Sequence, residues 1–125
     1  MLLRGRHVAI AAESHDTPSA CLFERAASSL GARVSHIGPD TLALDDQRQE
    51  TAARILGNLY DAIDFIPLPP ERAESLHSAA GVPIFADLGG DGSPLRSLLS
   101  ASADPVEREE ELLALMQAVL VEAMR

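Results

Sequence analysis

The chain has 125 residues, and 46% of them are hydrophobic, which is enough apolar material for one compact domain and excludes a wholly disordered chain. The formal net charge is -9, so no basic stripe is available for a polyanion, and nucleic acid is not expected as a partner. We expect a soluble cytoplasmic protein without membrane contact, because no apolar run is long enough to cross a bilayer and the first residues lack a signal-peptide pattern.

Short apolar runs alternate along the chain with segments of helical periodicity. The runs predict β-strands at residues 7–12, 33–37, 61–66 and 82–86. Helices are predicted from Thr17, a hydroxyl cap followed by proline, to Gly31, and then over about 47–60 and 71–80. After a glycine-rich loop at 88–93, a short helix begins at Pro94.

A final helix is predicted to start at Asp104, where a cap residue, a first-turn proline and Glu107 are in capping-box register. Strand and helix alternate four times, which favours parallel strands joined by right-handed crossovers. The predicted fold is therefore α/β: a small doubly wound four-stranded parallel sheet of order 2-1-3-4 with helices on both faces. Residues 1–125 form one domain, with 105–125 packing back on it, and Pro83 suits an edge strand.

The final helix carries a wide apolar stripe that covers about half of its circumference, with Val121 outside it. The stripe consists of Leu112, Leu113, Leu115, Met116, Val119, Leu120, Ala123 and Met124. One interpretation is a broad core-facing surface; the other is a helix that also contacts another subunit.

Six segments of the first hundred residues share their order and spacing with a known family of domains: residues 3–6, 23–31, 37–40, 51–56, 61–63 and 80–84. Together these segments resemble the carbamoyl-phosphate-binding amino-terminal domain of the aspartate/ornithine carbamoyltransferases. Residues 109–124 resemble the helix that returns from the second domain of those enzymes. The resemblance therefore implies a truncated, degenerate carbamoyltransferase whose flanking helices are joined through 101–104.

The residues that hold carbamoyl phosphate in the family are largely replaced here. The family's Ser-Thr-Arg-Thr-Arg signature corresponds to residues 16–20, where Pro18 and Ala20 replace both arginines, and Thr17 alone is retained. A third family arginine falls at Ile66. The His-Pro-x-Gln motif reads Ser-Pro-Leu-Arg at 93–96, and the Gly/Lys/Ser-rich loop corresponds to 44–48, in a chain without lysine.

These replacements predict a dead phosphate site. Each lost arginine removes a charge-assisted contact of about 1.5–3 kcal/mol. Asp16, where the family has serine, would repel a phosphate about 4 Å away by about 1–4 kcal/mol. Hydrogen bonds from helix amides and from two hydroxyls do not offset the sum of these lost contacts and this repulsion.

A remnant pocket is predicted from Thr17, Ser19, Ser93 and Arg96, with no catalytic residue assigned. The loop at 88–93 could cradle an anion with its amides, but a plain strand-to-helix turn is favoured because no P-loop pattern follows. The four histidines show no metal-ligand spacing, so neither metal nor cofactor is expected. Cys21 is expected to be buried on the first helix.

The leading hypothesis is a non-catalytic carbamoyltransferase-like domain that acts through self-association or a protein partner. The family resemblance implies a homotrimer as the first guess. One alternative is a small-anion or small-metabolite binding domain with a remodelled pocket. Another is a subunit that completes a carbamoyltransferase site with a full-length partner.

Overall fold

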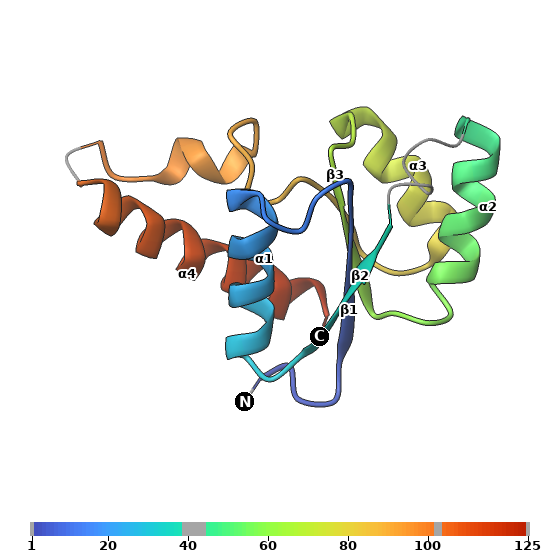
Figure 1. Cartoon of the computed structure of the whole chain (residues 1–125), viewed down its shortest axis with the longest axis horizontal. Coiled ribbons are helices and arrows are strands. Elements are labelled where there is room, and N and C mark those ends of the chain that lie inside the picture. Colours follow the sequence, from blue (N-terminus) through green and yellow to red (C-terminus); the bar gives the residue numbers. More distant parts are fainter. Residues whose placement is uncertain (1, 39–44, 102–103, 125) are drawn as a thin grey trace.

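The computed structural model describes residues 2–38, 45–101 and 104–124. Within these residues lie four strands, four α-helices and the 3-10 helix η2 (Figure 1). In chain order these are β1 (His7–Ala12), α1 (Pro18–Ser29), β2 (Arg33–Ile37), α2 (Asp46–Leu56), β3 (Ala62–Ile66), α3 (Pro70–Ala80), β4 (Ile84–Ala86), η2 (Pro94–Leu98) and α4 (Pro105–Ala123).

The strands form one parallel sheet of order β2-β1-β3-β4, which confirms the predicted fold class and strand order. Every residue of β3 is buried, and so are the last five residues of β1, because these two strands lie at the centre with helices over both faces. The β4 strand is shorter than predicted, Ile84–Ala86. Pro83 precedes it, and the Pro83 carbonyl accepts a hydrogen bond from the Ile63 N–H.

Helices α1 and α4 begin at the predicted caps. The Thr17 hydroxyl accepts from the Ala20 N–H at 3.2 Å, and Pro18 occupies the first turn of α1. At the start of α4, Asp104 Oδ1 accepts from the Glu107 N–H at 2.9 Å. Gly31 follows α1 with a φ of 96°, a backbone conformation that favours glycine.

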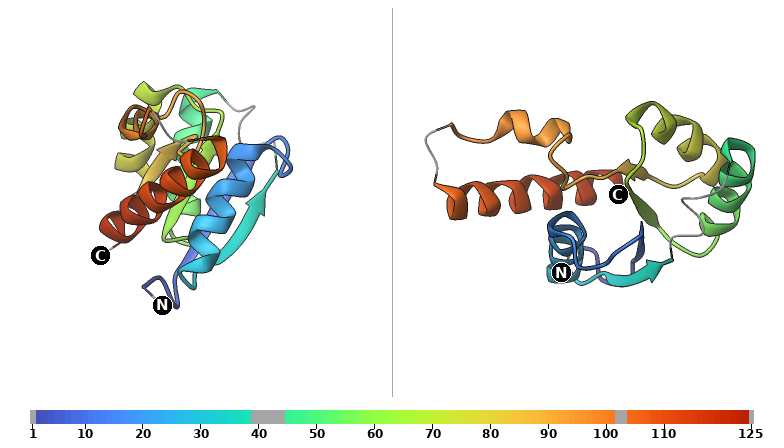
Figure 2. Two further views of the ribbon diagram at one scale, coloured as in Figure 1. Left: turned by 90° about the vertical axis from the view of Figure 1, so that its left-hand side faces the viewer. Right: turned by 45° about the horizontal axis from the view of Figure 1, so that its top comes forward.

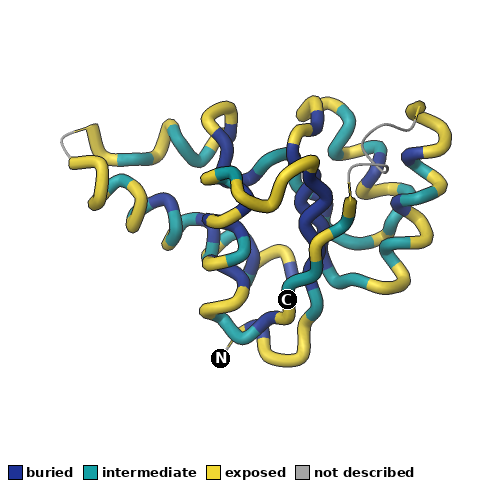
Figure 3. Tube along the Cα trace, in the orientation of Figure 1, coloured by how far each residue is buried: buried dark blue, intermediate teal, exposed yellow. Residues whose placement is uncertain are grey.

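The sheet separates two apolar clusters. Helices α1 and α4 cover one face, where Phe23, Met116 and Leu120 are fully buried together with Val8 and Ile10. Helices α2 and α3 cover the other face (Figure 1), where a second cluster contains Ala9, Ala11, Ala53, Ile63, Phe65 and Leu76. Figure 3 shows the most deeply buried stretch of the chain at the sheet between these layers.

Helix α4 packs along α1 through a narrower apolar face than the sequence predicts. Leu112, Met116 and Leu120, spaced by four residues, are buried. Of the remaining predicted stripe, Met124 is also buried, Leu113, Leu115 and Val119 are half-buried, and Ala123 is exposed. The first turns of α4 and the η2 segment extend side by side beyond the edge of the α1 layer (Figure 2). Polar contacts flank the packed face.

These polar contacts join α1 to α4 at two places. Arg25 Nη1 lies 3.3 Å from Glu109 Oε1, and Gln117 Nε2 donates to Ser29 Oγ at 2.6 Å. Both pairs link residues more than eighty positions apart, so they fix how α4 lies along α1.

The environment of Cys21 differs from expectation. Cys21 is exposed rather than buried, because it faces away from the sheet, on the side of α1 that also carries Pro18 and Arg25. In α2 the buried positions are Gln49 and Ala53. Ile55 lies two residues, about 200°, from Ala53 around the helix and is 59% exposed. Residues 39–44 and 102–103, which belong in part to the segments 37–40, 44–48 and 101–104 of the family resemblance, lie outside the described residues.

Candidate functional site

The candidate site lies at the carboxyl ends of β1 and β4, where ligands bind in open parallel sheets. The turn after β1 leads into the first turn of α1, which contains Thr17 and Ser19. The loop after β4, residues 87–93, leads into η2, which contains Arg96. The topology therefore brings the first turn of α1 next to the glycine-rich loop.

A hydrogen bond between Ser19 and Asp87 joins these two segments. The Ser19 hydroxyl donates to Asp87 Oδ1. The Asp87 N–H donates to the Phe65 carbonyl at 2.9 Å, and its backbone has a φ of 55°, a left-handed conformation. The Asp87 carboxylate, which belongs to the chain itself, thus accepts the hydrogen bond that the Ser19 hydroxyl donates.

The glycine-rich loop is folded tightly over the Asp87 side chain. A Cβ atom at Gly90 would lie 2.1 Å from Asp87 Oδ2, so a side chain there would displace the Asp87 carboxylate. The Gly90 N–H donates to the Asp87 carbonyl at 2.9 Å, and the Ser93 N–H donates to the Gly90 carbonyl at 3.0 Å. These two amides close turns within the loop, as the interpretation of residues 88–93 as a strand-to-helix turn requires.

The Arg96 guanidinium holds the same loop. Its Nη2 donates to the Gly89 carbonyl at 2.9 Å and its Nε donates to the Gly90 carbonyl at 3.3 Å. Asp91 Oδ1 lies 3.7 Å from Nη2. The two carbonyl groups orient the guanidinium, and Asp91, an exposed carboxylate, pairs with its charge.

The two other predicted site residues have capping hydrogen bonds. Thr17 caps α1, and the Ser93 hydroxyl, in a side chain that is only 6% exposed, accepts from the Leu95 N–H at 3.3 Å. The ligand-binding role of Thr17, Ser19, Ser93 and Arg96 stays a prediction. Sequence reasoning missed Asp87; its position directly after a strand and just before Leu-Gly-Gly is the signal that could have indicated it.

A second carboxyl group, Asp64 on β3, lies beneath this loop. Asp64 is fully buried, and its Oδ1 accepts from the Leu88 N–H at 3.1 Å. Burial raises the pKa of the Asp64 carboxyl well above its ordinary value, and the nearby charge of Asp87 raises it further, although the Leu88 hydrogen bond opposes both. Its Oδ2 atom has no hydrogen-bond partner.

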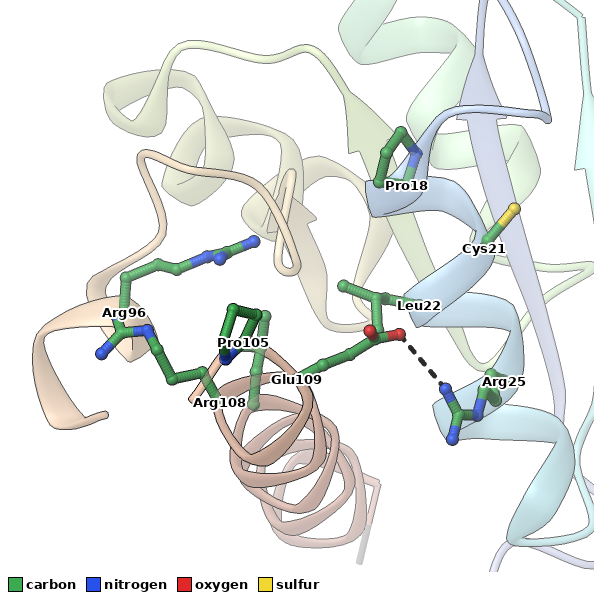
Figure 4. A pocket seen from close by; sticks show the side chains of 9 residues that line it. Pro18, Cys21, Leu22, Arg25, Arg96, Pro105, Arg108 and Glu109 are labelled. Atoms are coloured by element: carbon green, nitrogen blue, oxygen red, sulfur yellow. Dashed lines mark hydrogen bonds and ion pairs between the residues drawn. The ribbon is translucent and has the colours of Figure 1, made fainter. Parts of the chain in front are cut away.

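A groove of 470 Å³ is lined by residues of α1, α4 and η2 (Figure 4). Arg25, Arg96 and Arg108 line it together with Glu109, while Leu22 and Leu112 provide buried apolar surface. In Figure 4, the Arg25–Glu109 ion pair links α1 to α4, and Arg96 reaches in from η2. Of the four predicted site residues, only Arg96 borders this groove.

The histidines do not form a metal site. Within residues 2–38, 45–101 and 104–124, no three His, Cys, Asp or Glu side chains are placed to hold a metal ion. The His15 and His36 rings lie 4.1 Å apart, and His36 Nε2 is 3.3 Å from Glu24 Oε1. Among the described helices, none has the length and apolar character needed to cross a membrane.

The fold is one that carbamoyltransferases share. The ornithine carbamoyltransferase of Pyrococcus furiosus superposes on 68% of the chain with a TM-score of 0.55 and 26% identity, over 28% of its own length. A mitochondrial ornithine carbamoyltransferase from Coccidioides immitis has the same fold, with a TM-score of 0.58 over 78% of the chain and 30% of its own length, at 17% identity.

The sequence is similar to the same kind of enzyme as the fold. The chain is 34% identical over 101 residues, 80% of its length, to the ornithine carbamoyltransferase of Cutibacterium acnes. It is a relative of the carbamoyltransferases, which confirms the resemblance that the sequence motifs indicate. The chain spans about 30% of the length of the curated relatives it matches. No protein-family model matches the sequence.

Proposed function

We propose that this chain is a carbamoyltransferase-like domain that does not transfer carbamoyl groups and acts by associating with further copies of itself or with another protein. The observation that supports this most directly is the contact between Ser19 and Asp87. A phosphate bound at the start of α1 would need a hydrogen bond from the Ser19 hydroxyl. The Asp87 carboxylate already accepts that hydrogen bond.

The charge around this contact also disfavours phosphate. Asp87 lies at the Ser19 hydroxyl and Asp16 lies one turn before it, whereas Pro18 and Ala20 provide no positive charge. Arg96 is bound to the carbonyls of the glycine-rich loop. Anion binding here, as the alternative hypothesis requires, would oblige both Ser19 and Arg96 to exchange their present partners. That exchange costs charge-assisted hydrogen bonds.

The association half of the proposal rests on exposed apolar residues at one end of the molecule. Leu98 in η2 is 66% exposed and Val106 in the first turn of α4 is 67% exposed. Both lie on the part of α4 and η2 that projects beyond the α1 layer (Figures 1 and 2). Association would remove this apolar surface from water. Threefold symmetry is the first guess for a homo-oligomer, by analogy with the family resemblance.

Titration calorimetry with carbamoyl phosphate tests the non-catalytic half. We expect no saturable heat at millimolar ligand, while an intact ornithine carbamoyltransferase measured alongside binds. A dissociation constant below about 100 μM, which corresponds to about −5.5 kcal/mol, would overturn the proposal. Asp87→Asn is the informative variant: if weak binding appears only after this change, Asp87 is the group that excludes the anion.

A further inference from the structure

The groove between α1, α4 and η2 has the dimensions of a small-molecule site. Its volume of 470 Å³ falls in the range of about 300–1,000 Å³ that is usual for ligand pockets. Leu22 and Leu112, exposed by 8% and 1%, form apolar surface within it, and Pro105 adds a further apolar wall. Part of a ligand placed here would be in contact with carbon atoms.

The same groove has an excess of positive charge in an acidic protein. Three of the ten basic residues of the chain line it, against one carboxylate, Glu109. Glu109 is paired with Arg25 at 3.3 Å. The two other guanidinium groups are those of Arg96, whose Nη2 also lies 3.7 Å from Asp91 Oδ1, and of Arg108, which has no ion pair among the described residues.

Backbone carbonyls hold both of these guanidinium groups. Arg96 donates to the carbonyls of Gly89 and Gly90, and Arg108 Nη1 donates to the Ser100 carbonyl at 2.8 Å. A guanidinium has five N–H donors, so these bonds fix the position of each group and leave further N–H donors. The groove thus combines preorganised cations with apolar surface.

We propose that this groove binds a small amphipathic carboxylate, in which one carboxylate group is attached to an aliphatic or aromatic body without an ammonium group. The carboxylate would be bound by Arg108, which has no ion pair among the described residues, and the body would lie on Leu22 and Leu112. A phosphate fits less well, because it leaves the apolar surface unused and its second charge would be repelled by Glu109. This proposal does not depend on whether the α1 site binds carbamoyl phosphate.

Cys21 provides a built-in reporter for the test. It is the single cysteine of the chain, it is exposed, and it lines the groove. The rate at which a chromogenic disulfide reagent modifies Cys21 is measured with increasing sodium octanoate, below the concentration at which octanoate forms micelles. We expect the rate to fall and to saturate. Calorimetry on Cys21→Ser then measures the same affinity without the label.

Matched ligands and variants separate the parts of the proposal. 1-Octanol has the apolar body without charge, and acetate and inorganic phosphate have charge without an apolar body; each should protect Cys21 at least about tenfold less well than octanoate. Arg108→Gln should weaken octanoate about tenfold, as expected for the loss of one charge-assisted contact. Arg54→Gln on α2 is the control with the same change of charge and should leave the affinity unaltered.

The proposal is overturned by any of three results. The first is the absence of saturable protection by octanoate. The second is equal protection by octanoate and octanol, or by octanoate and phosphate. The third is equal weakening by Arg108→Gln and Arg54→Gln in samples whose circular dichroism shows that both variants are folded. None of these results bears on the calorimetry with carbamoyl phosphate, so the two proposals fail separately.

Discussion

Asp64 is a carboxyl group without exposed surface, and its hydrogen bond to the Leu88 N–H ties β3 to the loop that follows β4. Because burial raises the pKa of Asp64 in the folded protein, the folded chain retains a proton that the unfolded chain releases above about pH 3.9. The contribution of Asp64 to the free energy of unfolding therefore falls as the pH rises from the unfolded pKa of this carboxyl toward its folded pKa.

Asp64→Asn removes this titration and keeps an oxygen that can accept from Leu88. We expect the stability of the variant relative to the wild type to increase between pH 4 and pH 7. Each unit by which the folded pKa exceeds the unfolded pKa contributes about 1.4 kcal/mol. Urea unfolding across this pH range measures the difference. Asp16→Asn removes one exposed charge and is the control; parallel pH curves for wild type and Asp64→Asn would contradict the prediction.

Gly57 shows how one residue controls the distance between two helices. It follows α2 with ordinary helical angles, φ −64° and ψ −19°, so alanine would fit its backbone conformation. A Cβ atom there would nevertheless lie 2.1 Å from the Ala80 carbonyl oxygen at the end of α3. The close approach of α2 to α3 therefore requires glycine for steric reasons.

Gly57→Ala should lower the free energy of unfolding by about 1–3 kcal/mol, the usual cost of forcing an extra carbon into a packed site. Gly38→Ala is the matched control, because no described residue lies within 4 Å of its Cβ position and its φ is not positive. Denaturation midpoints report both variants. If Gly57→Ala is as stable as Gly38→Ala, the two helices can separate at little cost.

Helix α4 is an element whose core-facing side is a single row of residues four apart. Met116 and Leu120 are fully buried against α1 and the sheet, whereas Leu115 is half-buried. A charge at Leu120, such as Leu120→Glu, would thus enter the core and unfold the subunit, so this residue cannot report on an interface.

Truncation along α4 should distinguish the two sides of the helix. Met116→Ala should cost about 2–5 kcal/mol, and Leu115→Ala at most about 1 kcal/mol, because the first leaves a cavity and the second a surface that solvent can fill. Thermal or urea unfolding at low protein concentration, where association is weakest, gives both values. Equal losses would mean that α4 is rotated relative to this packing.

At the scale of the whole molecule, the proposed association has to overcome a net charge of -9 on each chain. Light scattering after gel filtration at tens of micromolar should give a mass that is a multiple of 13.3 kDa. Association should strengthen with added salt, because salt screens the repulsion between like-charged chains. A single species of 13.3 kDa at all salt concentrations would rule out self-association and leave a different partner.

Two exposed positions locate the contact. Val106→Glu on α4 should dissociate the assembly without lowering subunit stability, because the side chain is 67% exposed. Ile55→Glu, at a 59% exposed position on α2, makes the same change of charge and should not dissociate it. Dissociation by Ile55→Glu alone would place the interface on α2.

The sequence by itself determined the elements, their order in the sheet and the kinship with carbamoyltransferases. Caps such as Thr17 and Asp104 could be predicted because a cap bonds to an amide only three residues away. The order 2-1-3-4 could be predicted because parallel strands with right-handed crossovers leave few arrangements. Each of these features depends on local sequence or on general rules of chain connection.

Only the tertiary structure decided what surrounds the site residues. Ser19 and Asp87 are 68 positions apart, and Arg25 and Glu109 are 84 apart. No local pattern indicates such pairs, since they depend on the packing of α1 against a loop and against α4. The exposure of Cys21 follows from the same packing. Helical spacing identifies which residues share a face of α1. The placement of α4 and η2 determines which of these faces borders the groove.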